Sequence, residues 1–134
     1  MKYILVSAVC LTALGVGLFA QEGSELETWM KAINGANGSL RTNLKAQSGE
    51  AASADAKKVA DALDHVQGYF AAKHVDDAAK FAADARDGYK AVADLAAAGK
   101  FEEATTSLRA AGANCGGCHT AHREKGADGS YKVK

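Results

Sequence analysis

Four stretches of the sequence place apolar residues at the spacing of an α-helix, and no proline interrupts any of them. The strict alternation of polar and apolar residues that marks a half-buried strand is absent. Short turn signals, such as Gln47–Gly49, separate the stretches. The pattern therefore predicts an all-α chain. Amphipathic helices of about twenty residues joined by short turns are typical of an antiparallel up-down-up-down four-helix bundle.

The expected helix boundaries follow from capping signals. Ser24 followed by Glu27 has the spacing of a capping box, so the first helix is expected to begin at Ser24. It should end before Gln47–Gly49, and Gly99 suits the end of the third helix. Residues 126–134 are expected to be frayed, as chain termini often are. The remaining boundaries are expected near Lys73–His74, Asp76 and Phe101, and the fourth helix is expected to continue through His122.

Residues 1–20 have the composition of a secretory signal, because Lys2 is followed by a long apolar run that contains no acidic residue. Cleavage is expected after Ala20, which would leave residues 21–134 as one exported, periplasmic four-helix-bundle domain. The alternative is an uncleaved membrane anchor, because the run is nearly long enough to span a bilayer. The positive flank and the small residues before the polar stretch favour the signal.

The net charge of the chain bears on whether a nucleic acid or an anionic membrane is expected as a partner. The sequence carries 16 basic and 16 acidic residues, and its formal net charge is zero. A nearly neutral chain gives no electrostatic reason to expect a nucleic acid or an anionic membrane surface as a partner. No general base, nucleophile or phosphate-binding loop can be recognised, so no enzymatic activity is predicted.

The most specific feature of the sequence is CGGCHTAHR at residues 115–123. It continues the apolar stripe of the fourth helix, and its spacing places Cys115, Cys118 and His119 on one side of that helix. Cys-x-x-Cys-His is the attachment signature of c-type haem. Two thiols one helical turn apart can each bond a vinyl group of one porphyrin, and the next residue supplies an axial imidazole. Attachment requires reduced thiols and an extracytoplasmic assembly site, in agreement with the predicted export.

Three other interpretations of the cysteines compete with haem. A dithiol redox pair would use the two thiols alone, and a plain disulfide would close only a very short loop. Redox pairs usually open a helix next to a strand, and structural zinc sites usually hold small loops together. The motif, the export signal and the helical pattern therefore favour haem. A zinc site would draw its ligands from Cys115, Cys118, His122 and either His65 or His74.

With these features the chain resembles the cytochrome c-prime family, the class II c-type cytochromes. The resemblance rests on the export signal, the four helices and the CxxCH motif near the end of the last helix. It implies one covalently attached haem c, bound through Cys115 and Cys118, with His119 as an axial iron ligand. The family continues its motif with two residues, an aromatic residue and an arginine. Here His122 stands at the aromatic position and Arg123 matches the arginine. Arg123 lies one turn after His119, so it is expected either to contact the haem or to be a solvated arginine that is stabilised by the helix dipole.

The family divides by the sixth iron ligand. Residues 30–35, MKAING, are similar to the stretch that marks its methionine-ligated, low-spin branch. The resemblance implies that Met30 is the sixth ligand. By helical spacing alone, Met30 lies on the apolar face of its helix, where a methionine is more often core filler than ligand. His65 and His74 are the alternative ligands.

The resemblance also implies a function. A haem with His/Met ligation, which raises the iron potential, would make the chain an exported carrier of single electrons between other redox proteins. The alternative is a five-coordinate member of the family that binds small gases such as NO and CO at a vacant distal site. The family often pairs through its first two helices, which implies a homodimer. A membrane association is expected only if the signal is uncleaved.

Overall fold

The computed structural model describes residues 17–134, with side chains from Glu25 onward. Residues 1–16, which make up most of the predicted signal, lie outside the described part of the chain, so the signal and its cleavage stay predictions. None of the helices within residues 17–134 combines the length and the apolar composition that crossing a bilayer requires.

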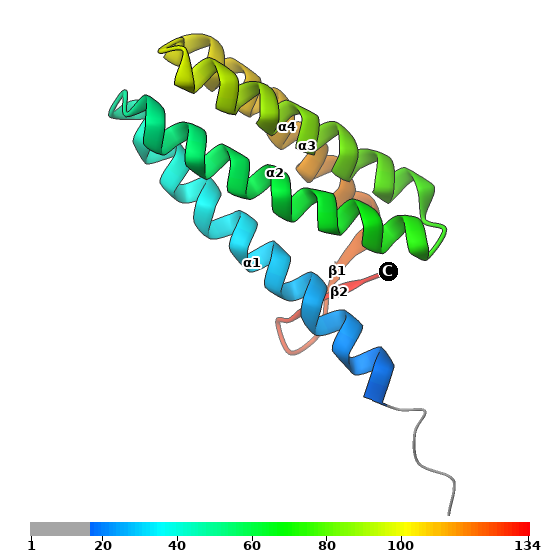
Figure 1. The fold of residues 1–134 in the computed structure, drawn as a ribbon. Helices are drawn as coiled ribbons and strands as arrows, with labels where there is room; N and C mark the ends of the chain where they lie inside the picture. The colour runs from blue at the N-terminus through cyan, green and yellow to red at the C-terminus, as the bar shows by residue number, and fades with distance from the viewer. Residues whose placement is uncertain (1–16) are drawn as a thin grey trace, which may run out of the picture.

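Four long helices follow one another and pack side by side (Figure 1). Because only short turns join them, consecutive helices run in opposite directions. The all-α, antiparallel four-helix bundle predicted from the periodicity is therefore confirmed. The helices are α1 (Gly17–Lys45), α2 (Gly49–Ala72), α3 (Asp76–Ala97) and α4 (Phe101–His122).

The first helix begins earlier than predicted. Its backbone is helical from Gly17, so Ser24 lies seven residues inside α1 and is not its cap. A capping box decides where a helix starts only if the preceding residues disfavour helix, and the LFAQE sequence of residues 18–22 consists of residues compatible with a helix. The predicted start at Ser24 is wrong for this reason.

The turns lie where the sequence placed them, and each contains a residue with a left-handed backbone. Gln47 has φ 56°, His74 has φ 57° and Gly99 has φ 73°. A residue in this conformation reverses the chain after a helix and lets the last carbonyls find new donors. The exposed His74 thus lies in the α2–α3 turn, which gives it a conformational role.

The core is built mainly from alanine, which lets the helices approach closely. A Cβ atom at Gly88 of α3 would lie only 2.7 Å from the Cβ of Ala111 on α4, so these two helices touch almost backbone to backbone there. The largest side chains that are fully buried are Tyr89, Leu40, Val59, Val66 and Val92.

Hydrogen bonds join α1 to its neighbours within this core. Ser39 and Asn43 donate to the buried Asp55 carboxylate of α2 over 2.5 Å and 2.8 Å. The Tyr89 hydroxyl of α3 donates to Oδ1 of Asn37 over 3.1 Å. These bonds satisfy polar groups that would otherwise be costly to bury, and they fix the register of α1.

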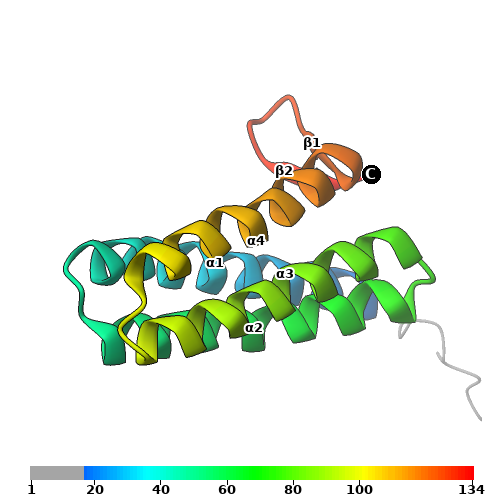
Figure 2. The ribbon, with the colours of Figure 1, turned by 90° about the horizontal axis from the view of Figure 1, so that it is seen from above.

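The bundle is not equally tight on its four sides. α2 packs extensively against α1 and α3, and α4 packs against α3, whereas α1 and α4 make few contacts with each other. Figure 2 shows the C-terminal half of α4 diverging from α1. The motif of residues 115–123 lies in this half of α4, so its position depends on α3.

The C-terminal residues are ordered as a small hairpin, so the predicted fraying is wrong. β1 (Arg123–Lys125) pairs antiparallel with β2 (Tyr131–Val133). The backbone N–H of Lys134 donates to the His122 carbonyl over 2.9 Å, and its Nζ donates to the Thr120 carbonyl over 3.1 Å. The hairpin therefore supplies donors to the end of α4, where helix carbonyls lack partners of their own.

Candidate functional site

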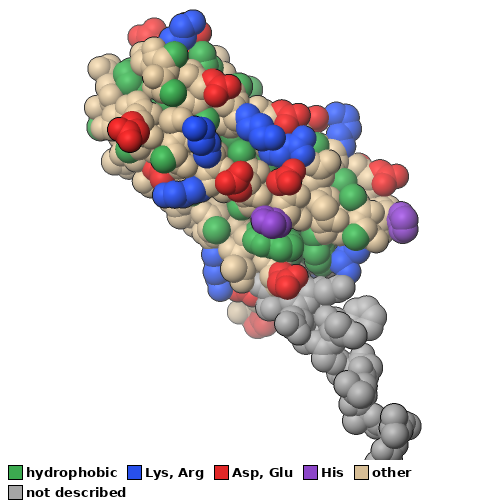
Figure 3. Space-filling model, viewed as in Figure 1, with side chains coloured by type: hydrophobic (Ala, Val, Ile, Leu, Met, Phe, Trp, Pro, Cys, Tyr) green, Lys and Arg blue, Asp and Glu red, His purple; other side chains and the backbone are tan. Residues whose placement is uncertain are grey.

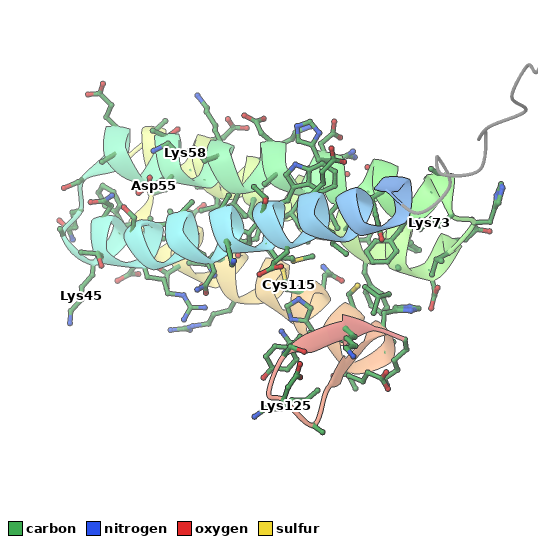
Figure 4. The ribbon with its side chains drawn as sticks, turned by 90° about the horizontal axis from the view of Figure 1, so that it is seen from below. Lys45, Asp55, Lys58, Lys73, Cys115 and Lys125 are labelled. Atoms are coloured by element: carbon green, nitrogen blue, oxygen red, sulfur yellow. The ribbon has the colours of Figure 1, made fainter. Side chains whose placement is uncertain are left out.

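The last two turns of α4 place the motif side chains on one face, as their spacing predicted. Cys118 is buried, and Cys115, His119 and His122 are half-buried. Cys115 packs against the central core, and Figure 4 shows it on α4 at the side that faces α1. Burial, and then the charge of a Cys115 thiolate, raises the pKa of the neighbouring Tyr89 to about 12.

The two cysteines are free thiols with a low tendency to ionise. Burial raises the pKa of Cys115. Burial likewise raises the pKa of Cys118, and the charges of Cys115 and Asp77 add to this effect. Reactive thiols of dithiol redox pairs usually have lowered pKa values. The electrostatics of the pair therefore do not favour the dithiol redox interpretation.

The two glycines of the motif have different surroundings. A Cβ atom at Gly117 would lie 2.8 Å from Cε1 of Phe81, so α4 packs directly on the Phe81 ring of α3 at this point. No atom lies within 4 Å of the corresponding position at Gly116. The contact between Gly117 and Phe81 could not be predicted from the sequence, because no local pattern shows that two helices meet there.

His119 lies half-buried in the last turns of α4. Burial lowers its pKa, and the positive charge of Arg123 lowers it further. The imidazole is consequently neutral at neutral pH. A neutral imidazole has a nitrogen lone pair available for a metal, so His119 is in the protonation state that iron ligation needs.

Met30 packs at the same end of the bundle as Cys118. The buried cluster here contains Cys118 and residues of α2 and α3, and Met30 is among the half-buried apolar side chains packed against it. The structure thus brings together, in one apolar environment, the methionine near the start of the chain and the cysteine near its end. The other half-buried members are Trp29, Ile33, Tyr69, Val75, Ala79 and Phe81.

The alternative histidine ligands, His65 and His74, are both exposed. The exposed His65 stacks on Trp29, with ring centroids 5.2 Å apart and planes 10° apart. Figure 3 shows apolar side chains gathered beside a histidine on the face of α1 and α2. In the part of the chain whose side chains are described, no three His, Cys, Asp or Glu residues form a group that could hold a metal ion.

His122 and Arg123, the last two residues of the 115–123 stretch, have partners that the sequence did not reveal. Nε2 of His122 lies 2.8 Å from Oδ2 of Asp77 on α3. The guanidinium of Arg123 lies over the Tyr131 ring of the hairpin, 4.1 Å from its centroid. Asp77 is 45 residues from His122 in the sequence, so no local signal links them.

Comparisons with known proteins identify no relative. No protein-family model, curated protein or solved structure matches the chain.

Proposed function

We propose that the chain is an exported c-type cytochrome that transfers single electrons through one covalently bound haem c. The observation that carries the proposal is the common face of Cys115, Cys118 and His119 on α4, next to the apolar cluster that includes Met30. The motif supplies two thiols one turn apart and a neutral imidazole, which is the donor set that haem c requires.

Each residue has a distinct role in this proposal. Cys115 and Cys118 would hold the porphyrin through thioether bonds, His119 would be the fifth iron ligand and Met30 the sixth. When bound, the haem supplies one-electron chemistry at its iron. Thioether sulfur and neutral imidazole carry no charge, and the surrounding apolar side chains limit access of water. Together these features favour the reduced state of the iron.

The packing of the bundle supports an apolar ligand at this end. Trp29, Tyr69 and Phe81 come from three different helices, and all three remain partly exposed around the buried Cys118. Large apolar side chains are usually covered in a small bundle, so a partly exposed group of them marks a surface suited to an apolar molecule. The few contacts between α1 and α4 agree with a ligand between these helices.

The partners and location follow from the same proposal. An electron carrier meets other redox proteins through small, weak interfaces, and no enzymatic reaction is assigned to the chain. The export signal would place the protein in the periplasm, where haem attachment occurs. The mass of the native protein tests whether two copies pair. The mass of the polypeptide tests whether residues 1–20 are retained as a membrane anchor.

The gas-binding alternative rests on one observation. Ile33 lies one turn after Met30 and packs against the same cluster, so either side chain could face an iron bound at His119. A haem with Ile33 over the iron would have a vacant sixth position and would bind CO or NO. A haem with Met30 over the iron would be low-spin and six-coordinate.

Absorption spectra of the oxidised and reduced protein, followed by addition of CO, test the proposal. The electron carrier is expected to show low-spin spectra in both states and slow or no binding of CO. High-spin spectra with rapid CO binding would support the gas-binding function and reject Met30 as ligand. A protein without a haem spectrum would contradict both functions.

A further inference from the structure

The motif end of α4 is tied to α3 at three points. Gly117 packs on the Phe81 ring, and Cys118 packs in a cluster that includes alanines of α3. Beyond them, His122 is hydrogen-bonded to Asp77. Because α1 touches α4 so little, these contacts determine how the last turns of α4 are rotated about the helix axis.

The His122 ring is held from two sides. Its Nε2–H donates to Oδ2 of Asp77 over 2.8 Å, and its centroid lies 6.3 Å from that of Phe70, with the planes tilted by 42°. The His122 side chain is only 17% exposed, whereas Asp77 is 65% exposed. The His122 ring is thus largely buried, and the Asp77 carboxylate contacts it from the solvent-exposed surface.

The electrostatics of both helices favour this contact. Asp77 lies in the first turn of α3, where the helix dipole stabilises a negative charge, and His122 lies in the last turn of α4. The hydrogen bond from His122 lowers the pKa of Asp77, so the acceptor stays ionised. Burial and the charge of Cys115 raise the pKa of Cys118, and the charge of Asp77 adds to this effect, which places the carboxylate beside the motif.

His122 follows His119 by three residues and Cys118 by four, so all three project from the same side of α4. A helix turn rotates as a unit, and fixing His122 therefore fixes the direction of His119. On the basis of the function proposed above, we propose that Asp77 and His122 form a positioning pair that sets the orientation of the His119 imidazole toward the haem iron. The pair itself does not touch the iron in this proposal.

His122→Phe is the decisive variant, because it retains a ring to pack on Phe70 but cannot donate to Asp77. Asp77→Ala removes the acceptor. Asp77→Asn keeps an acceptor oxygen without the charge. Asp84→Ala is the matched control, because Asp84 also forms an exposed ion pair on α3, with Lys80 at 2.7 Å.

The experiment uses the haem-loaded protein, and haem content is measured first for every variant. Electron paramagnetic resonance of the oxidised protein then reports the orientation of the axial imidazole through the g values. Wild type, Asp77→Asn and Asp84→Ala are expected to share one low-spin signal. His122→Phe and Asp77→Ala are expected to show a second signal beside it, because the loss of one ordinary hydrogen bond shifts the equilibrium between two imidazole orientations about fivefold.

Two results would overturn the positioning role. Wild-type g values in His122→Phe and Asp77→Ala, with only a lower unfolding midpoint, would show that the pair merely stabilises the fold. A second signal of the same size in Asp84→Ala would show that the effect is not specific. If Asp77→Ala does not accumulate, the spectra of His122→Phe and Asp77→Asn are compared instead. A second signal in His122→Phe alone supports the positioning role, and its absence from both contradicts that role. Wild-type protein without haem would instead refute the proposed function, before any signal is compared.

Discussion

Replacing Gly88 by alanine is expected to disturb the helix contact that positions the cysteines. A Cβ atom at Gly88 would lie 2.7 Å from the Cβ and 3.3 Å from the Cα of Ala111 on α4. Both distances are shorter than van der Waals contact, and the second involves backbone, which cannot rotate away. Ala111 is one helical turn before Cys115, so a shift here is transmitted to the motif.

The size of the effect follows from two opposing contributions. Exchanging glycine for alanine inside a helix stabilises it by about 1 kcal/mol where nothing obstructs the new methyl group. Forcing a methyl group into a filled space costs about 1–3 kcal/mol. Gly68 of α2 has no atom within 4 Å of its Cβ position, so Gly68→Ala should show the gain alone. Gly88→Ala should be about 1–3 kcal/mol less stable than Gly68→Ala.

Urea denaturation followed by circular dichroism measures both variants against the wild type. We expect the unfolding midpoint to rise for Gly68→Ala and to fall below that of the control for Gly88→Ala, with similar slopes. Equal stabilisation of the two variants would refute the close approach of α3 and α4 at Gly88. The position of Cys115 relative to α3 would then need to be different.

Two further perturbations test the core and the iron ligand. Asp55→Ala should lower the free energy of unfolding at neutral pH by about 1–3 kcal/mol, because Ser39 and Asn43 lose a buried acceptor. Burial raises the Asp55 pKa, but the hydrogen bonds outweigh burial and lower the pKa below 3.8. The stability difference between wild type and Asp55→Ala should therefore vanish as pH falls through that lower value. A stability difference that does not depend on pH in urea titrations would contradict this. Met30→Leu should keep its haem and bind CO much faster than wild type by stopped-flow absorption, whereas unchanged rates would remove Met30 from the iron.

Most of the fold could be predicted because its information is local. The apolar periodicity defined the four helices, and the left-handed turns at Gln47 and Gly99 fell where polar and glycine residues interrupt it. The start of α1 could not be predicted from Ser24, since a capping signal does not exclude a longer helix. The hairpin could not be predicted, because its strands are too short to show a periodic pattern. Its contacts, such as that of Lys134 with His122, leave no local signal in the sequence.

Only the local features of the candidate site could likewise be predicted from the sequence. The common face of Cys115, Cys118 and His119 follows from helical spacing and could be predicted. The partner of His122 could not be predicted, because in the sequence Asp77 resembles any other acidic residue at the start of a helix. Likewise, no local pattern links Gly117 to the Phe81 ring, because the contact between them arises only where α4 packs on α3.

Covalent attachment of haem is the claim on which the proposed function depends most directly. The measurement is the mass of the intact protein, together with its alkaline pyridine spectrum after denaturation, for protein produced in a host that matures c-type cytochromes. The polypeptide is expected to carry the added mass of one haem and a haem c spectrum, both lost when Cys115 and Cys118 are replaced by alanine. A colourless protein with the mass of the polypeptide alone would contradict the account.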